Sequence, residues 1–432
     1  MNKVWNVEAC AALRKNSYVR LFEAYQAEVA RFQNTMRIIR NLGTPCPFQK
    51  VHFSAGQLKY ENIDMLLNGS LELTNFYVHE PPSSSKVEFQ KHLYQILISQ
   101  AENLESFHCA LHDFISFGLL SHQSRPRVEL PKLREFGYWE GDIGPKPFGL
   151  KFVLEIINGS PNLERFHPKI FNDKTLHKVF KNTCLFPLKE LNIQAANPSI
   201  YPQLSSLQLP GLRILKLQVH QQIVDTQKMT SDILVGIVSS FSQTLEELSI
   251  CWPSNTPDAS FPICPNLRSL CIDNWMGSLG IFDPKCLPAL KKIHKIYNLP
   301  FGFNAVLNPH EGVDSLIVED RMERCYPPHI DLLQSVEEEY TYFFEYICCQ
   351  YPNLKSLDLT LPLSNSLLTS IVRIFPQLES LTLENGHSCF SLSEQIFTGV
   401  NKHTLSRYVV EGGRCPQAIP VPRMPCLLDL KS

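Results

Sequence analysis

A short apolar pattern, L-x-x-L-x-L, recurs along most of the chain and constrains its fold more than any other feature. Two clear copies, YPNLKSLDLTL (351–361) and FPQLESLTLEN (375–385), begin 24 residues apart. A proline often stands one or two places before the first leucine. The thirteen matches have their first apolar residue at Leu104, Leu133, Leu163, Leu188, Leu212, Leu245, Leu267, Leu290, Val313, Leu354, Leu378, Leu405 and Leu427.

The spacing of these matches predicts a repeat architecture. Apart from two gaps of 33 and 41 residues, successive matches lie 22 to 30 residues apart, close to the length of a leucine-rich repeat. One such repeat cannot bury its apolar face alone, whereas stacked repeats share a continuous core. We therefore expect an α/β leucine-rich-repeat solenoid, a horseshoe or an arc, with irregular repeats. The stretches 48–53 and 70–76 are interpreted as degenerate first turns.

Each match is expected to form a short strand with alternating faces. Leu354, Leu357 and Leu359 should point into the core, and the residues between them should point out. Between strands, helical spacing of apolar residues predicts helices over 151–159, 231–243 and 366–375, and a longer one over 331–351. The first of these ends in Gly159, which is typical of a helix C-cap.

Composition limits the function classes. Apolar residues make up 44% of the chain, and the formal net charge is -2, which argues against nucleic acid as the main partner. No apolar run is long enough to span a membrane, and the N-terminus lacks the apolar core of a signal peptide. The 14 cysteines are scattered singly, which favours reduced thiols. We expect a cytoplasmic or nuclear protein that is monomeric outside its complex.

Sequence motifs for catalysis are lacking. There is no phosphate-binding loop, dinucleotide fingerprint, nucleophile elbow or Cys-x-x-Cys pair. His108 and His112 are spaced for one helix face, but His108 falls on a predicted strand, so the pair is not expected to bind a metal. We therefore predict that the chain is not an enzyme and has no cofactor, no metal ligands and no catalytic residues.

The first part of the chain differs from the rest. Residues 1–45 contain two stretches of helical pattern, 5–22 and 23–42. Because a solenoid needs its open end covered, residues 1–45 are predicted to form a short helical N-terminal cap. Residues 46–432 are predicted to form the solenoid.

The stretch VWNVEACAALRKNSYVRL (4–21) resembles the end of an F-box as it occurs in arthropod F-box/leucine-rich-repeat proteins. Val4, Trp5, Asn6, Leu13 and Arg14 carry this resemblance. It implies that Val4, Trp5 and Leu13 are a remnant of the surface that binds a Skp-family adaptor. It also implies that the chain is the substrate-recognition part of an SCF, or cullin-RING, ubiquitin ligase in ubiquitin-dependent protein degradation. The Leu-Pro segment that opens an F-box would stand before Met1, which puts adaptor binding in question.

A target protein or peptide is expected to bind the concave face, which is made by the outward strand residues. The outward strand residues between 189 and 294 are mostly basic, except in one repeat where they are acidic. Those of the last third of the chain are neutral to acidic. Large aromatic residues near the strand ends either join this surface, as such residues do in binding hot spots, or cap the core. The candidate partner-binding residues are Trp139, Lys189, Arg213, Lys216, Trp252, Arg268, Trp275, Lys291, Lys292, His294, Tyr297, Lys355, Asp358 and Glu379.

Two other functions remain open. One is a leucine-rich-repeat scaffold or adaptor without a ubiquitin-ligase link. The other is an enzyme regulator of the ribonuclease-inhibitor type, although the repeats of that family are longer and more regular than those of this chain.

Overall fold

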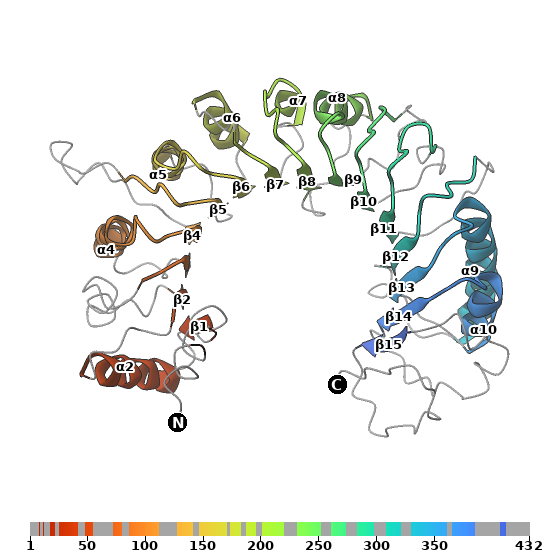
Figure 1. Cartoon of the computed structure of the whole chain (residues 1–432), viewed down its shortest axis with the longest axis horizontal. Coiled ribbons are helices and arrows are strands. Elements are labelled where there is room, and N and C mark those ends of the chain that lie inside the picture. The colour runs from red at the N-terminus through yellow and green to blue at the C-terminus, as the bar shows by residue number, and fades with distance from the viewer. Residues whose placement is uncertain are drawn as a thin grey trace. The chain divides into compact units, whose positions relative to one another are not determined.

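Successive repeats of the chain form parallel strands that pair in chain order, with helices in many of the connections (Figure 1). The computed structural model describes residues 8, 12, 18–21, 26–41, 48–54, 72–79, 86–111, 128–140, 147–170, 173–182, 187–195, 201–219, 231–251, 261–273, 283–297, 308–320, 330–360, 365–384 and 407–411. It divides into two compact units: unit 1 contains residues 1–212 and 217–224, and unit 2 contains residues 213–216 and 225–432. The division falls within the predicted solenoid span.

Unit 1 contains a run of parallel strands, each paired with the next. They are β1 (Tyr18–Leu21), β2 (Lys50–Ser54), β3 (Asn75–His79), β4 (Ser106–Leu111), β5 (Glu135–Glu140), β6 (Arg165–Ile170) and β7 (Glu190–Ala195). Its helices are α2 (Gln26–Asn41), α4 (Lys86–Ser99), α5 (Pro147–Asn158), α6 (Asp173–Asn182) and α7 (Tyr201–Leu204). Helices α4, α5 and α6 lie on one side of the strands, which leaves the other side as an open face (Figure 1).

Unit 2 repeats this arrangement. Its paired strands are β9 (Glu247–Cys251), β10 (Ser269–Asp273), β11 (Lys292–Tyr297), β12 (Ser315–Asp320), β13 (Ser356–Thr360), β14 (Ser380–Glu384) and β15 (Arg407–Glu411). Its helices are α8 (Ser231–Phe241), α9 (Ile330–Gln350) and α10 (Asn365–Ile374). Strand β8 (Ile214–Val219) lies where the two units divide.

The core of unit 1 contains a row of phenylalanines, one from each of four successive strands. Phe76, Phe107, Phe136 and Phe166 have no exposed surface, and neighbouring rings stack with centroids 5.7 to 5.8 Å apart. In unit 2 the same row is aliphatic, for example Leu270 on β10, which is also fully buried. Each inward side chain therefore packs on its counterparts in the neighbouring repeats, which gives the continuous core expected of stacked repeats.

Backbone and asparagine contacts join one repeat to the next. The carbonyl oxygen of Glu105 accepts hydrogen bonds from the N–H groups of both Arg134 and Glu135, at 2.9 and 3.1 Å. In the repeats that begin Pro-Asn-Leu, the asparagine side chain also donates to a backbone carbonyl of the preceding repeat. These donors are Asn162, Asn266 and Asn353, at 2.7 to 3.0 Å. The Pro-Asn-Leu lead therefore ties neighbouring repeats together.

The predicted repeat is confirmed in detail. The first twelve matches each lead into one strand, β4 to β15, and the thirteenth, at Leu427, lies outside the described residues. Leu354, Leu357 and Leu359 are buried, and the four predicted helices are present. The fold is an α/β leucine-rich-repeat solenoid with irregular repeats.

One local prediction is wrong. Tyr18–Leu21 was expected to be helical, but it forms strand β1, which pairs with β2 from Tyr18 to Leu21. The physical reason is that pairing with β2 satisfies this backbone in a sheet, so tertiary context overrides the local helical pattern. The second predicted helix is confirmed as α2. The role of residues 1–45 as a cap stays a prediction.

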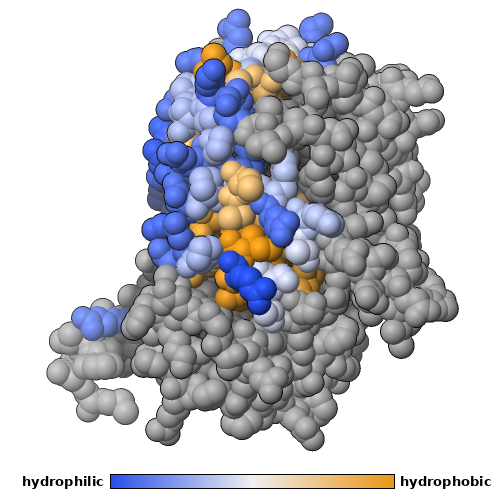
Figure 2. Space-filling model, turned by 90° about the vertical axis from the view of Figure 1, so that its right-hand side faces the viewer, coloured by the Kyte–Doolittle hydropathy of each residue, from blue (hydrophilic) through white to orange (hydrophobic). Residues whose placement is uncertain are grey.

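Figure 2 shows one face of the molecule, where polar residues line one edge of the described part and apolar residues gather in its middle.

Within the described residues, no helix has both the length and the apolar character needed to cross a membrane.

Candidate functional site

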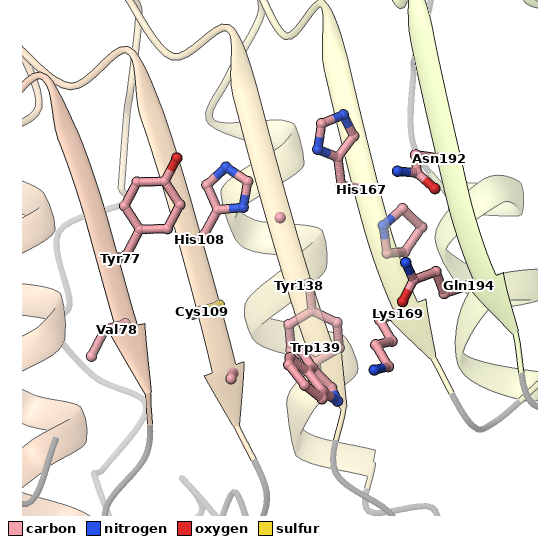
Figure 3. A pocket seen from close by; sticks show the side chains of 13 residues that line it. Tyr77, Val78, His108, Cys109, Tyr138, Trp139, His167, Lys169, Asn192 and Gln194 are labelled. Carbon is pink, nitrogen blue, oxygen red and sulfur yellow. The ribbon is translucent and has the colours of Figure 1, made fainter. Parts of the chain in front are cut away.

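A pocket of about 320 Å³ lies on the open face of unit 1 and is built by strands β3 to β7 (Figure 3). Strand register places Tyr77, His108, Gly137 and His167 beside one another in one row. Asn192 of β7 lies at the end of this row in Figure 3. All five line the pocket. In the pattern L-x-x-L-x-L, each residue of this row occupies the single outward position between the last two apolar residues.

A second row of the pocket contains its largest exposed side chain. Trp139 of β5 pairs in register with Lys169 of β6, which in turn pairs with Gln194 of β7. The Trp139 side chain is 38% exposed, and the Lys169 Nζ lies 3.7 Å from its ring centroid, a cation–π contact. Trp139 therefore lies on the open face of unit 1, and its role in partner binding stays a prediction.

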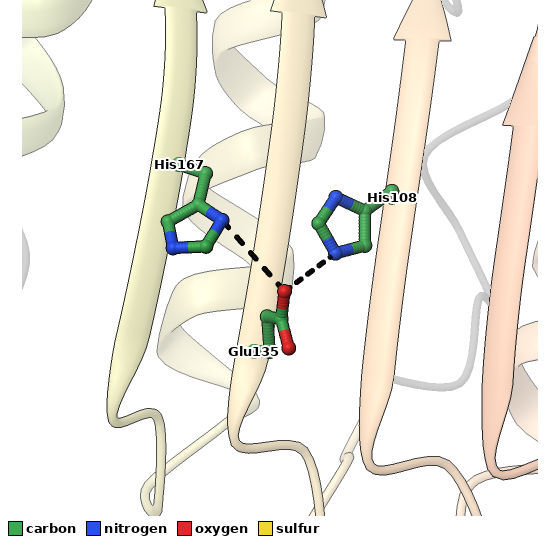
Figure 4. Close-up of side chains that lie close together, drawn as sticks. All are labelled: His108, Glu135 and His167. Atoms are coloured by element: carbon green, nitrogen blue, oxygen red, sulfur yellow. Dashed lines mark hydrogen bonds and ion pairs between the residues drawn. The ribbon is translucent and has the colours of Figure 1, made fainter. Parts of the chain in front are cut away.

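Three side chains from three adjacent strands meet at one edge of this pocket (Figure 4). His108 Nε2 lies 3.0 Å from Glu135 Oε1, and His167 Nδ1 lies 3.7 Å from the same oxygen. Arg165 donates from Nη2 to the other carboxylate oxygen of Glu135 at 2.8 Å. Glu135 thus stands between two imidazoles and a guanidinium, an arrangement that favours its charged form.

The electrostatics of Glu135 follow from these contacts. Its side chain is only 18% exposed. The hydrogen bond with His108 and the charges of His108, Arg165 and His167 together lower the pKa of Glu135 to about 2, against the opposing effect of burial. Glu135 is therefore a carboxylate throughout the physiological pH range.

Two features fix the position of the His108 ring. On one side it stacks on Tyr77, with ring centroids 4.5 Å apart and an interplanar angle of 13°. On the other side it lies over Gly137, where an added Cβ would be 2.0 Å from His108 Nδ1. A residue with a side chain at 137 would displace the ring. The glycine is required here because the ring closely approaches the neighbouring strand.

The far wall of the pocket offers an acceptor. Asn192 Oδ1 is a buried atom that has no hydrogen-bond partner in the described part of the chain. Beside it, Gln194 donates to Gln218 at 2.8 Å. Because a buried polar atom without a partner costs free energy, Asn192 is suited to accept a hydrogen bond from a bound ligand.

Several predicted partner-binding residues lie on exposed strand positions and pair across neighbouring repeats. Lys189 bonds to Glu164 at 2.7 Å and Lys355 to Glu379 at 3.0 Å. In unit 2, Arg213 lies 3.4 Å from Glu246, and Lys216 lies 2.9 Å from Glu247. Arg268, Lys291 and Lys292 are exposed, and Asp358 is partly buried. Five of the predicted residues, Lys189, Arg213, Lys216, Lys355 and Glu379, therefore form ion pairs between neighbouring repeats.

His294 of unit 2 is the predicted site residue with the most perturbed titration. Hydrogen bonds with Cys271 and with Glu319, whose Oε1 lies 2.8 Å from His294 Nε2, raise the pKa of His294 to about 9 against the effect of burial. The imidazole is therefore protonated near neutral pH.

The remaining predicted residues are outside what the structure describes. Trp252 and Trp275 fall on residues that are not described, and of Tyr297 only the backbone, at the end of β11, is described. Val4, Trp5 and Leu13, the predicted adaptor-binding remnant, also lie outside the described residues, as does His112.

The cluster of His108, Glu135 and His167 is not predicted by spacing along the chain. That spacing pairs His108 with His112, whereas the neighbours of His108 in the cluster lie one and two repeats away. The signal was present in the aligned matches Ser106-Phe107-His108, Glu135-Phe136-Gly137 and Arg165-Phe166-His167. Their register would have placed the two histidines on either side of the glycine. Among the described residues, these three side chains are the ones that could hold a metal ion.

Comparisons with known proteins reveal distant structural similarity. No protein-family model matches the chain, and no curated protein matches it either. A crystal structure of the Rad7 and Elc1 complex in yeast is similar with 14% identity and a TM-score of 0.48, covering 99% of this chain and 94% of that one. The leucine-rich repeat-containing protein LegL7 from Legionella pneumophila has 15% identity and a TM-score of 0.35, covering 78% of this chain and 90% of its own.

Proposed function

We propose that this chain is a non-catalytic protein-interaction module that binds a target protein or peptide in the open-face pocket of unit 1. The observation that carries this proposal is the pocket itself, where the exposed ring of Trp139 lies beside hydrogen-bonding side chains such as Asn192. An aromatic anchor flanked by a few polar groups is the composition of a binding hot spot. The pocket lies on the face that solenoids use for binding.

The ion pairs between neighbouring repeats support the choice of this pocket over the strand positions that form those pairs. Paired surface charges such as Lys189 with Glu164 already satisfy each other, and a partner would have to replace these contacts to use them. Such exposed pairs contribute little net free energy to association. The pocket instead offers apolar surface and an acceptor without a partner, Asn192 Oδ1. We expect most of the binding free energy to come from this pocket.

The link to a ubiquitin ligase is a finer proposal and rests on sequence resemblance alone. Val4, Trp5 and Leu13 resemble the end of an F-box, and the repeats resemble the target-binding part of the same families. On this reading the chain recruits its target to a Skp-family adaptor and a cullin-RING ligase. A scaffold with no ligase link would share the pocket and would lack the adaptor contact.

Site-directed photo-crosslinking tests the binding face. A photoreactive amino acid is placed at Gln194 in the pocket or, as the control, at Lys151, which is exposed on α5. In cells, a discrete crosslinked partner is expected from position 194 and not from 151. Trp139→Ala should reduce that product at least tenfold, while the thermal melt of the purified chain barely changes. Equal crosslinking from position 151, or a product that is insensitive to Trp139→Ala, would contradict the proposed site.

Co-purification with a Skp-family adaptor tests the ligase link separately. The expected result is a complex that survives gel filtration and is lost in Trp5→Ala with Leu13→Ala, whereas Trp139→Ala leaves it intact. If the chain binds its target through the pocket and no adaptor co-purifies, the scaffold function is supported in place of the ligase function.

A further inference from the structure

We propose that His108, Glu135 and His167 on the open face of unit 1 bind a transition-metal ion, with Zn²⁺ as the best fit. The geometry carries this inference. One ligand atom from each of the three side chains lies within 4.8 Å of the others. They come from β4, β5 and β6, so the sheet itself brings them together (Figure 4).

The distances are close to those of a coordinated ion. Nitrogen and oxygen ligands lie at about 2.0–2.2 Å from Zn²⁺, so two ligand atoms of a tetrahedral site are about 3.3–3.6 Å apart. In this structure Glu135 Oε1 is 3.0 Å from His108 Nε2 and 3.7 Å from His167 Nδ1. These two distances are within a few tenths of an ångström of that range, and the two imidazole nitrogens lie within 4.8 Å of each other. Binding of the ion would therefore draw the two rings together.

The donor set also fits. Imidazole suits zinc, copper, iron and nickel, and two histidines with one carboxylate form a three-ligand site that leaves positions open. Because His108 and His167 line the pocket, water or a side chain of a bound partner could occupy an open position. The neighbouring Cys109 is buried in the core, on the opposite face of β4 from His108, so it is not part of the donor set.

Neighbouring side chains hold the proposed ligands in orientation. The buried Nε2 of His167 lies 3.2 Å from Glu190 Oε1, an ion-pair contact that lacks hydrogen-bond geometry. A proton on Nε2 would face this carboxylate and would leave Nδ1 with its lone pair. Arg165 binds Glu135 Oε2 at 2.8 Å and leaves Oε1 toward the two imidazoles. A carboxylate behind a ligating histidine is the usual arrangement at metal sites.

The absence of a side chain at Gly137 is a second, independent observation that supports the metal site, because the His108 ring occupies the space where a Cβ would lie. An added Cβ at this position would lie 2.0 Å from Nδ1 and 2.7 Å from Cε1 of His108, and the three nearest atoms all belong to that ring. Gly137 thus allows the imidazole to lean across β5 toward Glu135. Gly137→Ala would remove no ligand atom and would still move one ligand away, which makes it a specific test of geometry.

The experiment measures Zn²⁺ binding to the full chain by isothermal titration under reducing conditions. Because the chain has 14 cysteines, wild type is compared with His108→Ala/His167→Ala, so that thiol sites contribute equally to both. The wild type should bind one more equivalent of Zn²⁺ than the double variant. Gly137→Ala and Glu190→Gln should lower the affinity for this additional Zn²⁺ ion roughly 10–100-fold.

His177→Ala is the matched control, because His177 is an exposed histidine of the same unit, on α6, and pairs with Gln203. It should leave the titration unchanged. Circular dichroism verifies the fold of each variant, and Zn²⁺ should raise the melting temperature of wild type more than that of the double variant. Equal stoichiometry and affinity in wild type and the double variant would overturn the proposal and leave the cluster as a hydrogen-bond network only.

Discussion

The rings of Phe107 and Phe136 stack in neighbouring repeats of unit 1, with centroids 5.7 Å apart and an interplanar angle of 11°. Neither ring has any exposed surface. Both belong to the buried row of phenylalanines that has one member on each strand from β3 to β6. The contact shows how one repeat depends on the next, because removal of one ring exposes two neighbours to a cavity.

Phe107→Ala is expected to destabilise the chain by about 3–5 kcal/mol, the range for truncation of a buried phenylalanine. The reason is lost burial together with a cavity in the row. Chemical denaturation followed by circular dichroism measures the change. Glu105→Ala on the same rung is the control, because Glu105 is exposed, and it should change stability by no more than about 0.5 kcal/mol. A loss below about 1 kcal/mol for Phe107→Ala would show that the row collapses around the gap.

Gly159 and Gly236 should respond oppositely to the same substitution. An added Cβ at Gly159, just after α5, would lie 2.1 Å from the backbone oxygen of Val128, whereas a Cβ at Gly236 on α8 meets nothing within 4 Å. Gly159→Ala should cost about 1–3 kcal/mol through overpacking. Gly236→Ala should stabilise by up to about 1 kcal/mol because alanine favours the helix. Thermal melts of the two variants measured side by side test this contrast.

Acid should weaken unit 1 through Glu135. Its pKa is lowered from 4.5 to about 2 in the folded chain, so its stabilising contribution is present above about pH 4.5 and is lost as the pH falls toward 2. Glu135→Gln removes this dependence. The denaturation midpoint of wild type should therefore fall more steeply than that of the variant between pH 4.5 and 2.5. Parallel profiles would show that Glu135 titrates normally, and Glu105→Gln serves as the exposed control.

Alkaline conditions should weaken unit 2 through His294. Its pKa is raised from 6.5 to about 9, so the stabilisation by protonated His294 is complete below about pH 6.5 and is lost as the pH rises through 9. We expect wild type to lose roughly 1–2 kcal/mol more than His294→Gln over this range. Denaturant titrations at pH 6, 7.5 and 9 measure the difference. A variant that loses as much stability as wild type would exclude this role of the His294–Glu319 contact.

The sequence by itself determined the repeat and which residues of each repeat face the core. The pattern L-x-x-L-x-L has a local cause, because alternate residues of a strand point to opposite faces. Leu354, Leu357 and Leu359 could therefore be assigned to the core from their spacing, and the structure buries all three. Helical spacing of apolar residues likewise predicted α5, and Gly159 marked its C-terminal end.

Only the tertiary structure decided which outward residues meet. Glu135 stands 27 residues from His108 along the chain, and their contact depends on the register between repeats whose connecting segments differ in length. The same holds for Tyr18–Leu21, which has a helical pattern but pairs with β2 as a strand. Local periodicity specifies a face of an element, whereas contacts across strands depend on long-range packing, and the proposed binding and metal sites consist of such contacts.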